Sequence, residues 1–171
     1  MNHYKSWSGL NKKLSEFLYD PLKDRIDYFI TRYHDVNNAY GRAAILLDKN
    51  EVVRFSWAEM YKQEYEISKK KFELKDNKCI TFAEIKDELK TRWDANCTYY
   101  EMDFLSAATD FLQMSIKDSL KSDNYIIRVF AILDKRLGKR TLQTIREEDK
   151  YKMLPEWVKQ FYELRLNFYN C

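Results

Sequence analysis

Three short runs rich in β-branched and aromatic residues lie between residues 25 and 57, and they constrain the fold more than any other feature. They read "RIDYFITRYH" (Arg25–His34), "RAAILLD" (Arg42–Asp48) and "VVRFSW" (Val52–Trp57). Runs of this kind, separated by turn-forming segments such as "DKNE", predict successive β-strands. In the third run Val53, Phe55 and Trp57 share one face. We therefore expect a three-stranded antiparallel meander with one face packed on a core.

Helical patterns flank this region on both sides. Trp7, Leu10, Leu14 and Phe17 recur at the three-and-four spacing of an amphipathic helix, which should end at the Asp20–Pro21 pair because the residue before a proline avoids helix. Helix-favouring residues follow the strands over 58–71. The charged stretch over 69–78 is expected to form a flexible connection or an edge hairpin.

From residue 81 onward the chain is expected to be helical. Thr81–Glu84 and Ser115–Asp118 have the S/T-x-x-E/D pattern with which many helices begin. Further helices are expected over 81–94, 99–114, 123–137 and 139–148. A last helix should start at Pro155, with an apolar stripe formed by Trp157, Phe161, Leu164 and Phe168.

Together these elements predict an α+β fold: a small three-stranded antiparallel meander after an N-terminal helix, packed against a mostly helical C-terminal half. A length of 171 residues fits a single domain, 1–171. Within it, 1–57 holds the helix and β-meander, 58–80 a helix and a variable connection, and 81–171 the helical part.

Composition excludes several classes of protein. Thirty Lys and Arg against 27 Asp and Glu leave a net charge of +3, which is less basic than nucleic-acid binding usually requires. No apolar run is long enough to span a membrane, and the start has no secretory signal, so a cytoplasmic location and no membrane partner are expected. Cys79, Cys97 and Cys171 are an odd number without a C-x-x-C motif, and there are two histidines. We expect neither a disulfide framework, nor a metal site, nor a cofactor.

Motifs of catalysis are also absent from the sequence, which predicts that the protein is not an enzyme and has no catalytic residues. There is no G-x-S-x-G, no glycine-rich phosphate loop and no H-E-x-x-H. Three E-x-K triplets, 73–75, 84–86 and 88–90, match half of a metal-dependent nuclease core, which needs them on a strand beside a second carboxylate. Charged residues at helical positions more often form a solvated face, so a metal-dependent hydrolase ranks third among the readings.

The segment "VFAILDKRLGKRTLQTI" (Val129–Ile145) concentrates positive charge around Gly138. A helical wheel places Ile126, Phe130, Leu133 and Leu137 on one apolar stripe, and the period slips at Gly138. Gly138 is therefore expected to end the first helix in a left-handed conformation. The candidate partner-contact residues are Arg128, Lys135, Arg136, Lys139, Arg140 and Arg146.

These cations have different expected roles. Lys135 and Arg136 would lie in the last turn of a helix, where cations complement the helix dipole. Lys139 and Arg140 would begin the next helix, which is electrostatically the wrong end. They should either pair with Asp134 or a later carboxylate, or bind an anionic partner.

The opening "SWSGLNKKLSEFL", the strand region "AAILLDKNEVV", the run "SIKDSLKSDNYIIRVFAILDKRLGKRTL" and the terminal "QFYELRL" resemble an uncharacterised bacterial protein family of similar length. Its members share a tryptophan-containing first helix and a C-terminal box, L-D-[KR]-R-[LV]-G-K-R-x-L, which spans Leu133–Leu142 here. The box also recurs in small bacterial proteins that resemble immunity proteins of toxin–immunity systems. The resemblance implies a cytoplasmic binding protein that neutralises a toxin.

The reading that ranks first is accordingly a non-catalytic cytoplasmic interaction protein with a protein partner, of the toxin-neutralising immunity type. The thirteen Tyr and four Trp of the chain support this hypothesis, because these residues often anchor protein interfaces. The alternative is a nucleic-acid-binding module that uses the basic residues around Gly138. The oligomeric state stays open at this stage.

Overall fold

The computed structural model describes residues 7–32, 41–74, 79–147 and 149–169. Helix α1 (Trp7–Phe17) and a 3-10 turn η1 (Asp20–Leu22) precede the strands β1 (Ile26–Arg32), β2 (Gly41–Leu47) and β3 (Asn50–Phe55). Helices α2 (Trp57–Leu74) and α3 (Phe82–Asn96) follow, then the short strand β4 (Thr98–Tyr99). The chain continues with α4 (Glu101–Gln113), α5 (Ile116–Lys121), α6 (Tyr125–Leu133), α7 (Lys139–Glu147), α8 (Asp149–Lys152) and α9 (Glu156–Asn167).

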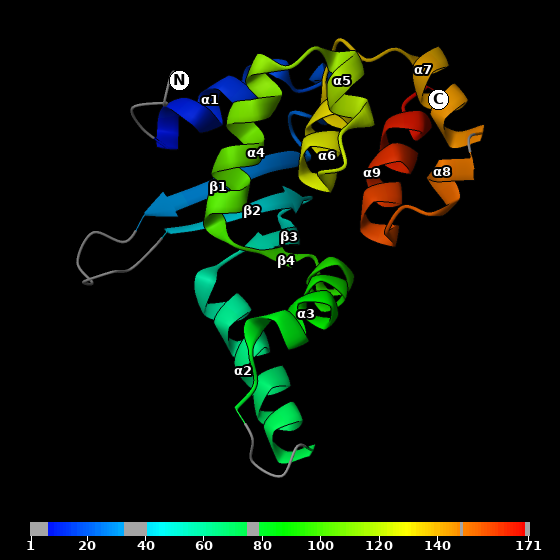
Figure 1. Cartoon of the computed structure of the whole chain (residues 1–171). Helices are drawn as coiled ribbons and strands as arrows, with labels where there is room; N and C mark the ends of the chain where they lie inside the picture. The colour runs from blue at the N-terminus through cyan, green and yellow to red at the C-terminus, as the bar shows by residue number, and fades with distance from the viewer. Residues whose placement is uncertain (1–6, 33–40, 75–78, 148, 170–171) are drawn as a thin grey trace.

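The sheet confirms the α+β class and adds a strand to the expected meander. Its order is β1-β2-β3-β4; the first three strands pair antiparallel, and β4 pairs parallel to β3. Two residues suffice for β4, which the sequence pattern does not reveal because so short a strand has no periodicity. Figure 1 shows α4 and α6 on one side of the sheet, and α7, α8 and α9 grouped beyond its end.

The turn between β2 and β3 explains why the third strand is shifted from its expected position. Asp48 and Lys49 both have positive φ, 50° and 67°, as in the two-residue type I′ turn that favours hairpins. The Arg25 guanidinium donates two hydrogen bonds to Asp48, of 2.8 and 2.6 Å, and these hold the pKa of Asp48 below its usual value. The strand therefore begins at Asn50 and ends at Phe55, whereas Trp57 begins α2.

Helix α1 covers the open edge of β1. The Asn11 side-chain amide donates a 2.6 Å hydrogen bond to the carbonyl of Tyr28 in that edge strand. On the neighbouring face of the helix Leu10 and Leu14 are buried in the core. An edge that is covered in this way offers fewer backbone groups to a second β-strand.

Helix α6 is the centre of the core. It packs against α4, α5 and α9, and these buried residues occupy nearly all of its sides: Ile126, Ile127, Val129, Phe130, Ala131, Ile132 and Leu133. The single apolar stripe expected from the wheel is therefore too narrow. Arg128, half-buried, is the basic residue of this helix.

The end of α6 differs from the expectation. The helix stops at Leu133, not near Leu137, and Gly138 has no left-handed φ. Asp134 instead takes an extended conformation (φ −70°, ψ 134°) and forms a β-bridge with Leu18. The expected placement of Lys135 and Arg136 in a last helical turn is thus wrong, because a tertiary contact ends the helix.

Helices α2 and α3 form a hairpin that extends away from the sheet (Figure 1). The hairpin has a small core of its own, made by Ile67, Ile85 and Leu89, with Ile80 and Trp93 partly buried beside it. The expected connection over 69–78 is helical up to Leu74, and 75–78 lie outside the described residues.

Several helix boundaries follow their local signals. At the start of α3 the Thr81 N–H donates to the Glu84 carboxylate at 2.9 Å, and at α5 the Asp118 N–H donates to the Ser115 hydroxyl at 3.1 Å. Both S/T-x-x-E/D predictions are confirmed. Pro155 directly precedes α9. Within the described ranges, no helix is both long and apolar enough to cross a membrane.

The two described cysteines should differ in reactivity. Both are free thiols, but Cys79 is exposed, whereas Cys97, which directly follows α3, is half-buried. Burial, with the nearby charge of Asp94, raises the pKa of Cys97 to about 11. Since the thiolate is the nucleophile, about one Cys97 thiol in a thousand is ionised near pH 8. We expect iodoacetamide to alkylate Cys79 well before Cys97, as peptide mass mapping would measure; equal rates would contradict the burial of Cys97.

Candidate anion-binding pocket

The basic segment between α6 and α7 is tied to the end of α1. The backbone N–H of Tyr19 donates to the carbonyl of Leu133 at 2.9 Å, and the N–H of Lys135 donates to the carbonyl of Phe17 at 2.8 Å. These two bonds hold the segment extended over the core. The end of α1 therefore helps to order the segment.

Arg136 pairs with its neighbour Asp134. Its Nε and Nη2 atoms donate to the buried Asp134 carboxylate at distances of 2.6–3.0 Å, and its backbone N–H donates to the same group at 2.7 Å. The guanidinium also lies 4.5 Å from the centre of the Phe17 ring. The side-chain hydrogen bonds that Arg136 donates to Asp134 raise the pKa of Arg136. Arg136 is thus occupied by neutralising a buried acid.

Arg165 of α9, which the sequence patterns did not single out, is fully buried beneath the same segment. Its guanidinium donates to the carbonyls of Ile132 (3.0 Å), Asp134 (3.3 Å) and Leu137 (2.8 Å). It also lies 3.5 Å from the centre of the Tyr19 ring. Arg165 therefore bonds three carbonyls at and beyond the early end of α6, among them that of Ile132, which lies in the last turn of α6 and has no helical partner.

Lys139 and Arg146 also have internal partners. The Lys139 ammonium donates a 2.9 Å hydrogen bond to the carbonyl of Tyr169, just beyond α9. A cation that begins one helix thus serves the negative end of another. Arg146 lies 3.2 Å from the Glu163 carboxylate, which also accepts the Tyr151 hydroxyl at 2.8 Å.

The remaining candidates differ in what surrounds them. Lys135 is exposed, and it belongs to none of the described pockets. Arg128 and Arg140 contribute to one pocket, together with Lys117 and Lys121 of α5. Of the six residues expected to contact a partner, the structure brings these two arginines together and gives Arg136, Lys139 and Arg146 internal partners.

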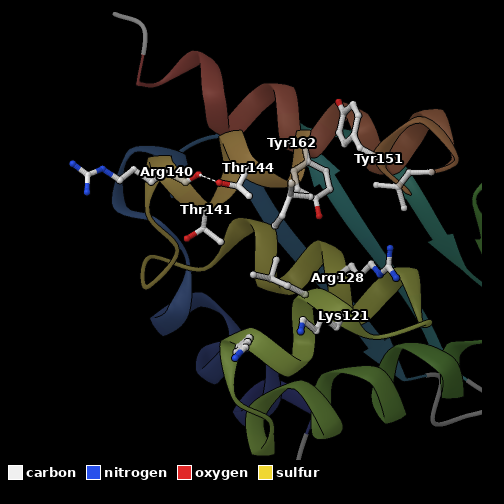
Figure 2. A pocket seen from close by; sticks show the side chains of 11 residues that line it. Lys121, Arg128, Arg140, Thr141, Thr144, Tyr151 and Tyr162 are labelled. Carbon is white, nitrogen blue, oxygen red and sulfur yellow. Dashed lines mark hydrogen bonds between the residues drawn. The ribbon is translucent and has the colours of Figure 1, made fainter. Parts of the chain in front are cut away.

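The pocket lies between α5, α6, α7 and the α8–α9 region, and its volume is about 540 Å³. It is lined by Lys117, Leu120, Lys121, Arg128, Arg140, Thr141, Thr144, Ile145, Tyr151, Leu154 and Tyr162. Figure 2 shows Lys121 and Arg128 on one side of Tyr162, and Arg140, Thr141 and Thr144 on the other. The Arg140 side chain extends outward at the rim. The cations are therefore spread around the opening.

The pocket has a strong positive bias. Four cations and no carboxylate are among its lining residues, and in the described part of the chain no acidic side chain pairs with Lys117, Lys121 or Arg140. The Arg128 Nε donates to the carbonyl of Ser122, which holds its guanidinium in place beside the Tyr125 ring. A concave site of one charge attracts ligands of the opposite charge.

The inner surface of the pocket is apolar and aromatic. Tyr151 and Tyr162 meet edge to face with ring centres 5.4 Å apart, and Leu120, Ile145 and Leu154 complete this surface. Such a combination accommodates a ligand with an apolar group flanked by negative charges.

The lysines of α5 were missed in the sequence, although a signal exists. Lys117 and Lys121 are four residues apart and therefore lie on one face of a helix whose start, Ser115–Asp118, is predictable. The spacing of the two lysines does not predict that α7 forms the opposite wall of the pocket.

The described residues do not form the metal site that the hydrolase hypothesis requires. Glu84, Lys86, Glu88 and Lys90 lie on α3, and Glu73 on α2, rather than on a strand; Lys75 lies outside the described residues. Among the residues that the structure describes, no three His, Cys, Asp or Glu side chains are grouped to hold a metal ion.

A family model described as the SF0329 protein family matches residues 6–166. No curated protein and no solved structure matches the chain. The family match includes α1, the sheet, the hairpin and the helices that surround the pocket, up to the penultimate residue of α9. Because one family model spans nearly its whole length, the chain belongs to the SF0329 protein family.

Proposed function

We propose that the chain is a non-catalytic interaction protein whose basic pocket receives an acidic segment of a partner protein. The observation that carries this proposal is the set Lys117, Lys121, Arg128 and Arg140 around a concave aromatic surface without a carboxylate. Charges at a partly exposed rim each contribute about 0.2–1 kcal/mol to an ion pair. Specific binding therefore needs several of them together with an apolar anchor.

The arrangement favours an extended acidic segment over a single small anion. Lys121 and Arg128 stand on one side of Tyr162 and Arg140 on the other (Figure 2), so one carboxylate would reach one side only. A segment with two or more carboxylates that flank an apolar side chain would use both sides and place the apolar group against Tyr162.

A nucleic acid is the alternative ligand, and the geometry favours it less. Arg136, Lys139 and Arg146 would be needed for a continuous path along phosphates, yet they bond to Asp134, the Tyr169 carbonyl and Glu163. The free cations line a bounded hollow rather than a long basic groove.

The partner that we propose is a toxin, and the place of action the cytoplasm. The support is the resemblance of Leu133–Leu142 to the box of immunity-type proteins, together with free thiols at Cys79 and Cys97. A toxin with an acidic loop near its active surface would match the pocket.

Titration with three fluorescent probes tests the ligand class. We expect an acidic peptide with a central Phe between Glu residues to bind saturably and with salt-dependent affinity. Single-stranded and duplex DNA of equal charge should bind at least tenfold more weakly. The Lys121→Glu/Arg140→Glu variant should lower peptide affinity at least tenfold.

A matched control variant is Lys12→Glu/Lys86→Glu, which makes the same charge change at exposed sites away from the pocket. It should leave peptide binding within about twofold, since remote exposed charges are screened. Equal loss in both variants, or DNA that binds better than the peptide, would refute the proposed ligand class.

Co-expression with neighbouring toxin genes tests the proposed partner. The wild-type chain should rescue the growth of cells that express the toxin, and the Lys121→Glu/Arg140→Glu variant should not. No rescue by the wild type would refute a toxin as the partner.

A further inference from the structure

The α2–α3 hairpin exposes more large hydrophobic side chains than any other described part of the chain. Nine such side chains are exposed among the described residues, and six are on this hairpin: Trp57, Tyr61, Tyr65, Phe72, Leu74 and Phe82. Contiguous exposed apolar surface on a protein marks a site of interaction.

Four of them form a stripe along α2. At about 100° per residue, Trp57, Tyr61, Tyr65 and Phe72 fall within an arc of about 80°, with Ser68 between them. Their exposed fractions are 44%, 52%, 58% and 39%. Trp57 stacks on Tyr61 with ring centres 5.1 Å apart and an interplanar angle of 14°. The stacking makes this end of the stripe a firm surface.

The charge of α2 does not suit a charged partner. The helix carries four acidic residues (Glu59, Glu64, Glu66 and Glu73) and four basic ones (Lys62, Lys69, Lys70 and Lys71). A polyanion such as nucleic acid would meet as many repulsive as attractive charges. A balanced surface suits a partner with the same balance.

We infer that a second copy of this chain binds here, with the two α2 helices antiparallel and related by a two-fold axis. In one register Tyr61 of each copy packs against Phe72 of the other, and Tyr65 packs against the small Ser68. In the same register Lys62 of one copy lies on the same flank as Glu73 of the other, offset by two residues, or about 3 Å, along the helix axis, which long side chains can span. Lys62 and Glu73 lie about 20° apart on one flank of the stripe, so this contact forms twice by symmetry.

Both members of this pair are available. Lys62 and Glu73 are exposed, and no ion pair or hydrogen bond engages either side chain in the described part of the chain. By contrast, Glu66 and Lys71 on the same helix contact Arg92 and Glu88 of α3. The intermolecular pair would therefore replace no internal one.

The available area sets the strength of the pairing. An aromatic side chain buries about 150–250 Å², so the exposed parts of the four stripe residues amount to about 400 Å² per copy. Two copies would bury about 800 Å² of ring surface, plus the stems of flanking lysines, which is less than the roughly 1,200–2,000 Å² of stable interfaces and corresponds to a weak, transient pairing. A dimer that dissociates at micromolar concentration is the expected result.

A second copy bound to α2 would also stabilise the α2–α3 hairpin. Its own core contains three buried residues, Ile67, Ile85 and Leu89. So small a core gives a helical hairpin little stability, and a second hairpin packed on α2 would enlarge the buried surface.

Sedimentation velocity across a wide concentration range tests the inference. We expect the wild type to shift from monomer to dimer in the micromolar range, and Tyr65→Glu to weaken the dimer at least tenfold. Met153→Glu changes an exposed apolar residue outside the hairpin and should leave the dimer unchanged. A wild-type chain that stays monomeric at several hundred micromolar would overturn the inference, as would a dimer that Tyr65→Glu leaves intact.

A charge swap tests the register independently of folding. Lys62→Glu and Glu73→Lys should each weaken the dimer several-fold, because each places like charges opposite one another twice. The double variant Lys62→Glu/Glu73→Lys should restore wild-type affinity, which loss of folding could not produce. A double variant as weak as the two single ones would overturn the antiparallel register. The Lys121→Glu/Arg140→Glu variant should dimerise normally, so this result and the proposed function stand or fall separately.

Discussion

Replacing Arg165 by methionine is expected to lower the thermal midpoint by about 10 °C. The change removes the donors that bond the carbonyls of Ile132, Asp134 and Leu137. The last two keep a second donor, the Leu137 N–H (3.1 Å) and the Tyr169 hydroxyl (3.2 Å) respectively, whereas the buried carbonyl of Ile132 loses its partner. Each hydrogen bond from a charged donor contributes about 1.5–3 kcal/mol, so the loss of these bonds should cost about 3–5 kcal/mol in all. In a chain of this length each kcal/mol corresponds to about 2–4 °C.

Two variants separate this effect from the loss of a positive charge. Arg140→Met removes an exposed arginine in the first turn of α7 and should shift stability by less than about 0.5 kcal/mol. Arg165→Lys keeps the charge but cannot reach three carbonyls with one nitrogen, so it should recover only part of the loss. Differential scanning calorimetry measures all three. A wild-type midpoint for Arg165→Met would show that the carbonyls find other partners.

Gly41→Ala is expected to destabilise the fold by about 3 kcal/mol or more. A Cβ at Gly41 would lie closer than 3.0 Å to the carbonyl oxygen of Thr31 and to the ring of Trp7. The ring could move, but the carbonyl belongs to the β1 backbone, so the strand pair itself would have to shift. Overpacking against flexible side chains costs about 1–3 kcal/mol, and a backbone neighbour places this case at or above the upper limit.

Gly138→Ala is the matched control, because the chemical change is the same and the surroundings differ. No heavy atom lies within 4 Å of a Cβ built at Gly138, and its φ is not positive. We expect a change of less than about 0.5 kcal/mol, or a slight gain from reduced freedom of the unfolded chain. Urea denaturation of both variants measures the difference. Strong destabilisation by Gly138→Ala would mean that the segment after α6 packs more closely than described.

The pocket shows how far sequence reasoning reaches toward a site. The wheel correctly separates the positive charges before and after Gly138, since no continuous helix joins them. For Lys139 it suggests a carboxylate or an anionic partner, whereas the acceptor in the structure is the backbone carbonyl of Tyr169, 30 residues away. It also passes over Arg165, whose neighbours Leu164 and Leu166 make it look like a polar interruption in an apolar stripe. A basic residue within the apolar stripe of the last helix could have predicted a buried arginine at this position.

The fold was more accessible than the site. Patterns of period two and of period three to four located β1 to β3 and helices α1, α3, α4, α7 and α9 to within a few residues, because each of these elements buries a face defined by its own sequence. The misplaced end of α6 has another origin. Its last expected turn forms a bridge with Leu18, over a hundred residues earlier, and no local pattern reports such a contact.

What the sequence by itself determined, then, is the α+β class, the meander and the capped helix starts, since local propensity and periodic burial suffice for these. Only the tertiary structure decided which cations are available. It placed Arg136, Lys139 and Arg146 against internal acceptors and brought Arg128 and Arg140 together with Lys117 and Lys121 around one pocket. The physical reason is that a charge is satisfied or left free by whatever group lies within about 4 Å in space, and for these residues that group is set by how the helices pack.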